Sequence, residues 1–198
     1  MAALRKAPAK VDRLIVGLGN PGAEFARTRH NVGFQVLEVL ARRHRLPKPA
    51  RAFAGRYSTG EVCGVRVGLL APHTFMNESG RSVAAALRGL GLTSADLLVV
   101  HDHIDLGFGR IRVADDGGTG GHNGLKSLHE LVGRDFDRVR VGVDRPPTTD
   151  PDIVADYVLS PFAEPDDQVK RLIDEAADAV EAWLRDGLEV AAARSSLT

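Results

Sequence analysis

A glycine-rich segment lies between an apolar run and an amphipathic run near the start of the chain. The apolar run is Leu14-Ile15-Val16, residues 17–34 follow it, and the amphipathic run covers residues 36–46. This succession predicts a buried strand, a tight turn and a helix, a unit typical of α/β proteins. The segment also contains His30, a side chain suited to proton transfer near neutral pH. We therefore expect it to form the floor of a catalytic cleft.

Strand and helix patterns alternate along the rest of the chain. We expect strands at residues 11–17, 53–60, 61–71, 97–100, 107–113 and 139–143, and helices at residues 31–45, 76–90, 123–132 and 165–186. The second and third strands should form a hairpin that turns near Cys63-Gly64. The layout predicts a single-domain α/β layer sandwich, a twisted mixed β-sheet flanked by helices. We place this domain at residues 11–190, between a flexible N-terminal tail (1–10) and a C-terminal tail (191–198).

Composition narrows the class of protein further. The 198 residues are enough for one domain with a sizeable core. The 26 basic and 26 acidic side chains cancel, so overall charge does not indicate a nucleic-acid binder, although a local basic patch stays open. The single cysteine, Cys63, excludes an intrachain disulfide and fits a reducing compartment. No run reaches membrane-spanning length, and residues 1–10 lack the apolar stretch of a secretory signal. We expect a cytoplasmic protein.

His30 and Asp102 form the first candidate pair for catalysis. Asp102 is the second residue after the strand expected at residues 97–100, and His30 follows the glycine-rich turn. Ligands of open α/β sheets bind beyond the carboxyl ends of the strands, so the two side chains could meet there. A carboxylate orients a catalytic imidazole and stabilises its charged form. From the residues alone, an ordinary surface or hydrogen-bonded histidine stays open as well.

A dinucleotide site is a formal alternative for the first glycine-rich segment. Gly17, Gly19 and Gly22 have the spacing of the dinucleotide-binding fingerprint. That fingerprint requires a helix that begins among its glycines, and Pro21-Gly22 interrupts one. We therefore do not expect a nicotinamide or flavin cofactor.

A metal site is the alternative for the histidines after the fourth strand. His101 and His103 would share one face of a strand and could chelate an ion together with His122 or Asp105. The chain contains neither an HxxxH pair on a helix nor a cysteine cluster, which argues against a metal. A solvated or structural pair of histidines stays open.

A second glycine-rich segment, residues 117–124, precedes the helix expected at 123–132. Five of its eight residues are glycine. Free backbone N–H groups at a helix N-terminus bind anions and polarised carbonyl groups. We therefore expect this loop to belong to the functional site, although a simple entry loop would have the same appearance.

Five motifs together resemble those of bacterial-type peptidyl-tRNA hydrolases, in the family's order, from about residue 11 to about residue 190. The motifs are Leu14-Ile15-Val16-Gly17-Leu18-Gly19-Asn20-Pro21-Gly22, Thr28-Arg29-His30-Asn31-Val32-Gly33-Phe34, Pro72-His73-Thr74-Phe75-Met76-Asn77-Glu78-Ser79-Gly80, His101-Asp102 with Asp105-Leu106, and Gly120-Gly121-His122-Asn123-Gly124-Leu125. The resemblance implies an enzyme that cleaves the ester between a peptide and the 3′ ribose of tRNA, and so recycles tRNA from stalled or dropped-off translation. Its partner would be peptidyl-tRNA, through the acceptor stem and the 3′ CCA end.

The resemblance also implies roles for individual residues. His30 would be the general base that activates water, and Asp102 would orient it. Amide side chains would hold the peptide backbone and the 3′ end, because they bind N–H and C=O groups that every peptide has. Asn123 would also position the water or the developing oxyanion. The full set of implied substrate-binding residues is Asn20, Phe25, Phe75, Asn77, His122 and Asn123. Neither a metal nor another cofactor is implied, and we expect a monomer.

Arg140 matches a position that contacts tRNA phosphate in the family, and Arg112 and Lys126 are further candidates for tRNA binding. Phosphate contacts carry no sequence information, so binding should be largely sequence-blind. Ala114 stands where the family often has a lysine that clamps the tRNA 5′ phosphate, and Asp115-Asp116 adds negative charge beside it. Either neighbouring basic residues compensate, Arg110 among them, or the affinity is weaker and falls less steeply with salt.

Other positions depart from the family's pattern. Phe25 stands where tyrosine is common, His103-Ile104 replaces a more usual Glu-Leu, and Asp144 replaces a usual glycine. None of these affects the His30–Asp102 pair. A non-catalytic RNA-binding module on the same fold is the main rival to the enzyme, and a metallohydrolase centred on His101 and His103 is another.

Overall fold

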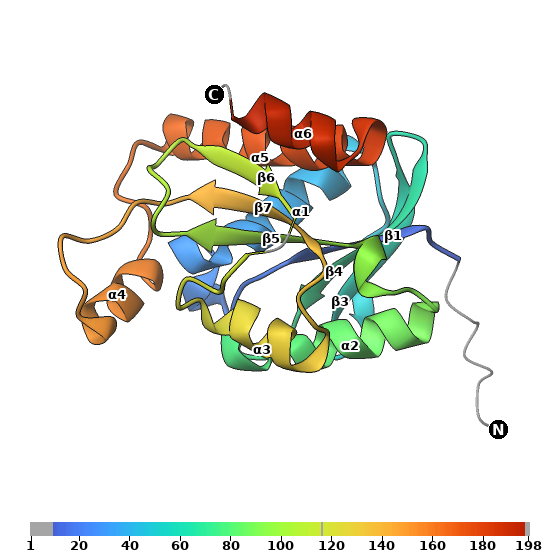
Figure 1. Ribbon diagram of the computed structural model, residues 1–198, viewed down its shortest axis with the longest axis horizontal. Helices are drawn as coiled ribbons and strands as arrows, with labels where there is room; N and C mark the ends of the chain where they lie inside the picture. Colours follow the sequence, from blue (N-terminus) through green and yellow to red (C-terminus); the bar gives the residue numbers. More distant parts are fainter. Residues whose placement is uncertain (1–9, 116, 197–198) are drawn as a thin grey trace.

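The computed structural model describes residues 10–115 and 117–196, and within them seven strands form one twisted sheet (Figure 1). The strands are β1 (Arg13–Gly17), β2 (Ala50–Ala52), β3 (Gly55–Val62), β4 (Val65–Pro72), β5 (Leu97–His103), β6 (Ile111–Ala114) and β7 (Asp137–Gly142). Their order across the sheet is β2-β3-β4-β1-β5-β7-β6. The central strands β4, β1, β5 and β7 are parallel, whereas β3 pairs antiparallel with both β2 and β4, and β6 with β7. The predicted fold class is confirmed.

Helices cover both faces of the sheet. They are α1 (Val32–Arg43), α2 (Ser79–Leu90), α3 (Asn123–Leu131), α4 (Pro151–Val158), α5 (Asp166–Asp186) and α6 (Leu188–Ser195). In Figure 1, α5 and α6 lie above the sheet, α2 and α3 lie below it, and α4 lies beyond the arrowheads of β5 and β7. The carboxyl ends of the parallel strands therefore open toward α4. None of the described helices is both long and apolar enough to span a bilayer.

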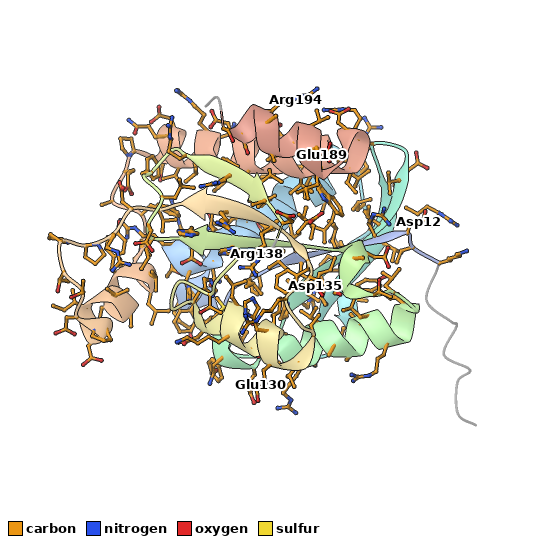
Figure 2. The ribbon with its side chains drawn as sticks, viewed as in Figure 1. Asp12, Glu130, Asp135, Arg138, Glu189 and Arg194 are labelled. Atoms are coloured by element: carbon orange, nitrogen blue, oxygen red, sulfur yellow. The ribbon has the colours of Figure 1, made fainter. Side chains whose placement is uncertain are left out.

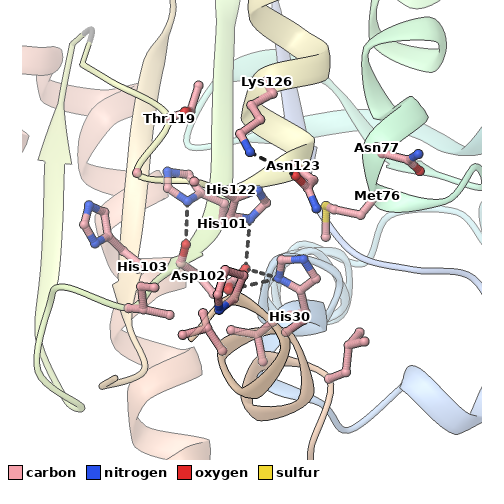
Figure 3. Close-up of a pocket in the computed structure, with 18 of the residues that line it drawn as sticks. His30, Met76, Asn77, His101, Asp102, His103, Thr119, His122, Asn123 and Lys126 are labelled. Carbon is pink, nitrogen blue, oxygen red and sulfur yellow. Dashed lines mark hydrogen bonds and ion pairs between the residues drawn. The ribbon is translucent and has the colours of Figure 1, made fainter. Parts of the chain in front are cut away.

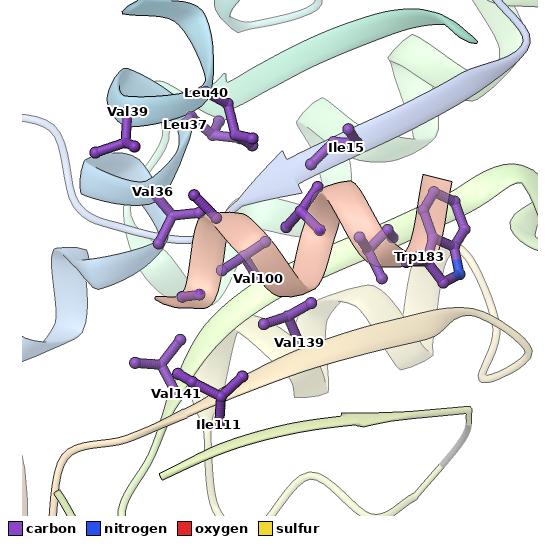
Figure 4. Packing of buried hydrophobic residues seen from close by; sticks show 14 of the residues in the cluster. Ile15, Val36, Leu37, Val39, Leu40, Val100, Ile111, Val139, Val141 and Trp183 are labelled. Atoms are coloured by element: carbon purple, nitrogen blue, oxygen red, sulfur yellow. The ribbon is translucent and has the colours of Figure 1, made fainter. Parts of the chain in front are cut away.

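The alternation of side chains along the strands gives each face its own core. Ile15, Val100 and Val139 point toward α1 and α5 and pack with Trp183 (Figure 4), while Leu14 and Val99 point toward α2 and α3. Successive side chains on a strand point to opposite faces, so a continuous apolar run supplies both cores at once. This two-sided burial explains the unbroken apolar runs at residues 14–16 of β1 and 97–100 of β5.

Gly33 brings α1 into direct contact with the central strands. A Cβ atom at this position would lie 2.4 Å from the backbone nitrogen of Leu18 and 2.5 Å from the carbonyl oxygen of Val100. Only glycine therefore allows the first turn of α1 to pack against β1 and β5 at this distance. As a consequence, His30, three residues earlier in the chain, lies at the carboxyl ends of these strands.

The structure differs from the expected elements in three segments. The short strand β2 was not expected; it pairs with β3 at the edge of the sheet. The helix α4 was not expected; Asp150 begins it by accepting a hydrogen bond from the Asp152 backbone, and Pro151 occupies its first turn. The helix α6 covers most of the segment expected as a C-terminal tail, because the chain only bends at Gly187 and Ala191 is then buried beside the core. Of the expected N-terminal tail, residues 1–9 lie outside the described residues, as do residues 197–198.

Candidate active site

A cleft of about 760 Å³ opens at the carboxyl ends of the parallel strands, between α3 and α4. It brings together most of the residues that the sequence singled out, although they come from distant segments. The predicted site residues that line it are Asn20, Phe25, His30, Phe75, Asn77, Asp102, His122, Asn123 and Lys126. Arg112 and Arg140 do not line it.

His30 and Asp102 are in direct contact inside this cleft (Figure 3). The Nδ1 atom of His30 lies 2.9 Å from Oδ1 and 3.0 Å from Oδ2 of Asp102. Both residues are buried, with 8% of His30 and 3% of Asp102 exposed. The expected proximity of the two side chains is confirmed. Because Nδ1 donates its proton to the carboxylate, Nε2 is the nitrogen left to accept a proton from a water molecule.

Burial and charge act in opposite directions on His30. Burial of the imidazole lowers its pKa, whereas the negative charge of Asp102 and the hydrogen bond to it raise the pKa, and the net effect is a rise. For Asp102, burial raises the pKa, but the electrostatic effect of the neighbouring His30 and His122 rings and their hydrogen bonds hold the pKa well below its usual range. Asp102 is therefore a carboxylate near neutral pH, able to stabilise an imidazolium beside it.

His122 is a second donor to Asp102, which the sequence did not predict. Its Nε2 atom lies 3.0 Å from Oδ1 of Asp102. Its Nδ1 atom accepts hydrogen bonds from the backbone nitrogens of Gly124 (3.1 Å) and Leu125 (3.4 Å), so that His122 caps α3. Backbone N–H groups can only donate, so Nδ1 carries no proton and Nε2 does. His122 is thus fixed in one neutral tautomer, in agreement with a pKa that burial lowers.

The amide of Asn20 is oriented by its own hydrogen bonds. Its Oδ1 atom accepts from the backbone nitrogen of Met76 at 2.8 Å. The backbone of Asn20 is held in turn by the Asn31 side chain, which bonds both its nitrogen (2.8 Å) and its carbonyl oxygen (2.9 Å). With Oδ1 occupied, the NH₂ group of Asn20 is the part available to a ligand, and it can bind a carbonyl oxygen.

Two further carboxamides and an aromatic ring border the cleft. Asn123 begins α3, and its Oδ1 atom lies 3.3 Å from Nζ of Lys126, which leaves the NH₂ group to face a substrate. Asn77 lies in the short turn before α2, beyond Met76 on the side of the cleft where Asn123 lies (Figure 3). Phe75, 61% exposed, is next to it. A large exposed aromatic side chain beside three carboxamides is suited to contact with a base or an apolar side chain.

The histidines that prompted the metal hypothesis do not converge on one point. His101 donates from Nδ1 to its neighbour's carbonyl oxygen, that of Asp102, at 2.7 Å, and its pKa is lowered well below the usual range by burial first of all. Among residues 10–115 and 117–196, the groups that could hold an ion near the cleft do not include His101 with His103; the group there is His30, Asp102 and His122. In that group Nε2 of His122 carries a proton, so it has no lone pair to offer an ion.

The first glycine-rich segment does not have the structure of a dinucleotide site. The chain after Gly22 forms a short 3₁₀ turn (Ala23–Phe25), and the α-helix begins only at Val32. Within residues 17–31 no α-helix therefore begins among the glycines, as the dinucleotide-binding fingerprint requires.

The far wall of the cleft is α4, a helix that the sequence pattern did not lead us to expect. Val154 and Val158 of this helix line the cleft. Arg29, directly before the base candidate, anchors the segment: its Nη1 atom lies 2.6 Å from the carbonyl oxygen of Pro161, and its guanidinium lies 4.1 Å from the ring centre of Tyr157. The helix α4 could have been predicted from the cap at Asp150-Pro151 and from apolar residues at helical spacing. Nothing in the sequence around Arg29 predicts that its side chain contacts this segment.

Basic side chains extend from the cleft toward the edge of the sheet. Arg140 on β7 pairs with His101 on β5, and Arg112 on β6 pairs with Arg140, so the three positions lie side by side on one face. Beneath the second glycine-rich segment, the buried Arg138 (Figure 2) donates to the carbonyl oxygens of Gly117 and Gly118 at 2.9 Å each. The loop is thereby held above β7, close to Arg140.

Comparisons with known proteins agree on one family. The family model described as Peptidyl-tRNA hydrolase matches residues 14–197. A protein of that name from Geobacter metallireducens is 47% identical over 178 residues, which cover 89% of this chain and 90% of the relative. One from Mycobacterium sp. (strain KMS) is 46% identical over 181 residues, 90% and 93% of the two chains. The crystal structure of peptidyl-tRNA hydrolase from Acinetobacter baumannii superposes with a TM-score of 0.84 at 35% identity, covering 92% and 93%.

Proposed function

The chain belongs to the peptidyl-tRNA hydrolase family, and we propose that it hydrolyses the ester between the peptide and the 3′ ribose of peptidyl-tRNA with His30 as the general base. The observation that carries the residue assignment is the 2.9 Å contact between His30 and Asp102 in a cleft that three carboxamides line. The reaction recycles tRNA from stalled or dropped-off translation.

The proposed chemistry needs one activated water molecule. Nε2 of His30 takes a proton from water as the oxygen attacks the ester carbonyl, and Asp102 stabilises the imidazolium that forms. A positioned base of this kind contributes about 10²–10⁴-fold to a rate. An ester is more reactive than an amide, so this base does not need a covalent nucleophile. The imidazolium then returns its proton to the departing 3′ oxygen.

The carboxamides supply the donors that the transition state needs. The free NH₂ groups of Asn20 and Asn123 are positioned to bind the carbonyl oxygen of the ester or of the peptide. Negative charge builds up on the ester carbonyl oxygen during attack, and an NH₂ donor there stabilises it. Asn77 also lines the cleft and can bind a peptide amide. Ordinary aminoacyl-tRNA carries a single residue with a free amino group and therefore has no peptide amide. We expect that the enzyme does not hydrolyse it.

Binding of the tRNA is proposed for the basic row that starts at the cleft. Lys126 lies at its mouth, and Arg140 and Arg112 continue across the sheet. Ala114, where the family often has a lysine, follows Arg112 on the same strand, and Asp115 comes next; Asp116 lies outside the described residues. Arg112 and Arg140, which lie opposite each other on β6 and β7, can compensate for the missing lysine, because each can pair with a phosphate.

Release of the amino acid from an N-blocked aminoacyl-tRNA tests the assignment. His30→Ala should lose at least about 100-fold in turnover, the lower bound for a positioned base. His73→Ala, at an exposed histidine outside this cleft, is the matched control and should be unaffected. Equal release by His30→Ala and the unmodified protein would refute the base assignment. RNA binding without release by the unmodified protein would favour the non-catalytic module.

We also propose that the enzyme works without a metal, as a monomer, in the cytoplasm. The fixed tautomer of His122 supports the first point, because its protonated Nε2 cannot bind an ion. Activity should therefore survive treatment with a chelator, and loss that zinc restores would overturn this. The location follows from the substrate, which ribosomes produce, and sedimentation at working concentration tests the monomer.

A further inference from the structure

A second group of potential metal ligands lies at the other end of α1 from His30. His44 follows the last turn of α1, Cys63 lies in the turn between β3 and β4, and Glu181 lies on α5. Each offers one ligand atom, and these atoms all lie within 4.8 Å of one another. The three residues are partly exposed, so an ion can reach them from solvent. None of them lines the active-site cleft.

We propose that His44, Cys63 and Glu181 form a binding site for a divalent cation of the zinc type. An imidazole nitrogen, a thiolate sulfur and a carboxylate oxygen are all ligands that Zn²⁺ prefers, at bond lengths of about 2.0–2.3 Å. A tetrahedral ion of this size holds its ligand atoms about 3.3–3.8 Å apart. The ligand atoms here lie within 4.8 Å of one another, and small rotamer changes of the partly exposed side chains can bring them to this spacing. A water molecule would take the fourth coordination position.

The histidine of this group can act as a ligand, in contrast to His122. The Nε2 atom of His44 faces Glu181 at 3.0 Å, and among the described residues no hydrogen bond engages its Nδ1 atom. Without an ion, Nε2 donates its proton to the carboxylate of Glu181. When an ion binds, the proton can move to Nδ1, and the Nε2 lone pair is then available to the ion. Binding releases the thiol proton of Cys63 to solvent, and the thiolate and carboxylate together balance the two positive charges of the ion.

Arg43 is the cation with which a bound ion would compete for the carboxylate of Glu181. Arg43 approaches Oε1 of Glu181 at 3.3 Å, the same oxygen that His44 contacts. It keeps shorter contacts to Asp178 (2.6 Å) and Asp174 (3.2 Å), so it can give up Glu181 without losing its partners. An ion at this site would join the β3–β4 turn to both α1 and α5, and it should raise the melting temperature as its concentration rises.

Cobalt is a direct probe, because Co²⁺ bound to a thiolate shows a sulfur-to-metal charge-transfer absorption. Cys63 is the only cysteine of the chain, so this band reports on this site alone. We expect a saturable band in the untagged full chain that Zn²⁺ displaces, and no band in Cys63→Ser. His44→Ala and Glu181→Gln should each weaken Co²⁺ binding about tenfold or more, whereas His73→Ala should not change it.

Two results would overturn the proposal. One is the lack of a saturable band in the unmodified protein. The other is an unchanged affinity in the double variant His44→Ala/Glu181→Gln, which would mean that the thiol binds cobalt alone. Circular dichroism and ester hydrolysis without added metal check that each variant folds, and both should be unchanged in Cys63→Ser because Cys63 lies outside the cleft.

Discussion

The Nδ1 atom of His30 lies 2.9 Å from Oδ1 of Asp102, although 72 positions of sequence separate the two residues. The parallel pairing of β1 with β5 brings the carboxyl ends of these strands together. Gly33 then allows α1 to begin directly above them. The pair is therefore a product of the sheet order and of one close helix-to-strand contact, and it governs the pH behaviour of the site.

The substitution Asp102→Asn should lower both the rate and the pKa of the base. His30 acts as a base only when neutral, so kcat/KM of the unmodified protein should rise with pH through a midpoint above the ordinary value of about 6.5. In Asp102→Asn the burial that lowers the pKa stays, while the charge that raises it is lost. The midpoint should therefore move to lower pH, and the plateau should fall about 10²–10⁴-fold.

A pH–rate profile with N-blocked aminoacyl-tRNA measures both effects. Far-ultraviolet circular dichroism of Asp102→Asn at each pH controls for loss of fold. A reduced plateau with an unshifted midpoint would contradict the idea that Asp102 sets the pKa of His30.

Substitutions of His122 can separate its hydrogen bond to Asp102 from its role as the cap of α3. Asparagine can replace it as a helix cap but is too short to donate to Asp102. His122→Asn should therefore keep most of the stability while turnover falls about tenfold or more, since a hydrogen bond to a charged group contributes about 1.5–3 kcal/mol. His122→Ala should lose the cap as well, and about 1 kcal/mol more in urea unfolding. Equal turnover in His122→Asn and the unmodified protein would show that the contact to Asp102 has no part in catalysis.

The sequence indicated the cleft well because its residues follow strands. Asn20 and Asp102 lie shortly after the apolar runs at residues 14–16 and 97–100, and parallel strands place such positions at one edge of the sheet. His30 follows the glycine-rich turn and directly precedes α1, which begins over the same edge. The role of His122 could not be read in the same way. Its position before a helix predicts proximity to the site, but only the two backbone donors, Gly124 and Leu125, fix which ring nitrogen faces Asp102.

Contacts made across the fold were beyond the reach of a sequence pattern. Arginine is usually a surface residue, yet the side chain of Arg29 is only 4% exposed. It is buried because it stacks on Tyr157 and donates to the carbonyl oxygens of Ser160 and Pro161, which lie 131 and 132 positions away in the sequence. The helix α6 was missed for another reason. The glycine at 187 ends α5, but a glycine with φ of 82° only bends the chain and does not stop the helix that follows.

The backbone of Asp144, at a position where the resemblance to the family implies glycine, has a conformation that suits glycine. Its φ is 60°, in the left-handed region that glycine adopts without strain. Asp144→Gly should therefore leave the free energy of unfolding unchanged or raise it by up to about 1 kcal/mol, whereas Asp144→Val should lower it by about 1–3 kcal/mol. Urea unfolding of the pair measures this, and a Val variant as stable as the Gly variant would disprove backbone strain at this position.

Arg29 should be needed for the wall of the cleft rather than for the chemistry. Arg29→Lys keeps the charge but loses the planar group that stacks on Tyr157 and bonds Ser160 and Pro161 together. We expect a loss of about 2 kcal/mol in stability and a rise in KM that exceeds the fall in kcat, because α4 lines the cleft but carries neither His30 nor Asp102. A normal KM in a folded Arg29→Lys protein would show that α4 does not take part in binding.

Salt dependence tests the basic row without reference to the chemistry. Each phosphate contact releases a counterion, so loss of one should reduce the slope of log affinity against log salt by about 1. Arg112→Ala should show this reduction and weaken all tRNAs alike, since phosphates carry no sequence information. Arg88→Ala, an exposed arginine on α2, provides the comparison and should keep the full slope. If Arg112→Ala also keeps the full slope, the edge strand β6 does not contact tRNA, and the clamp for the 5′ phosphate must lie elsewhere than beside Ala114.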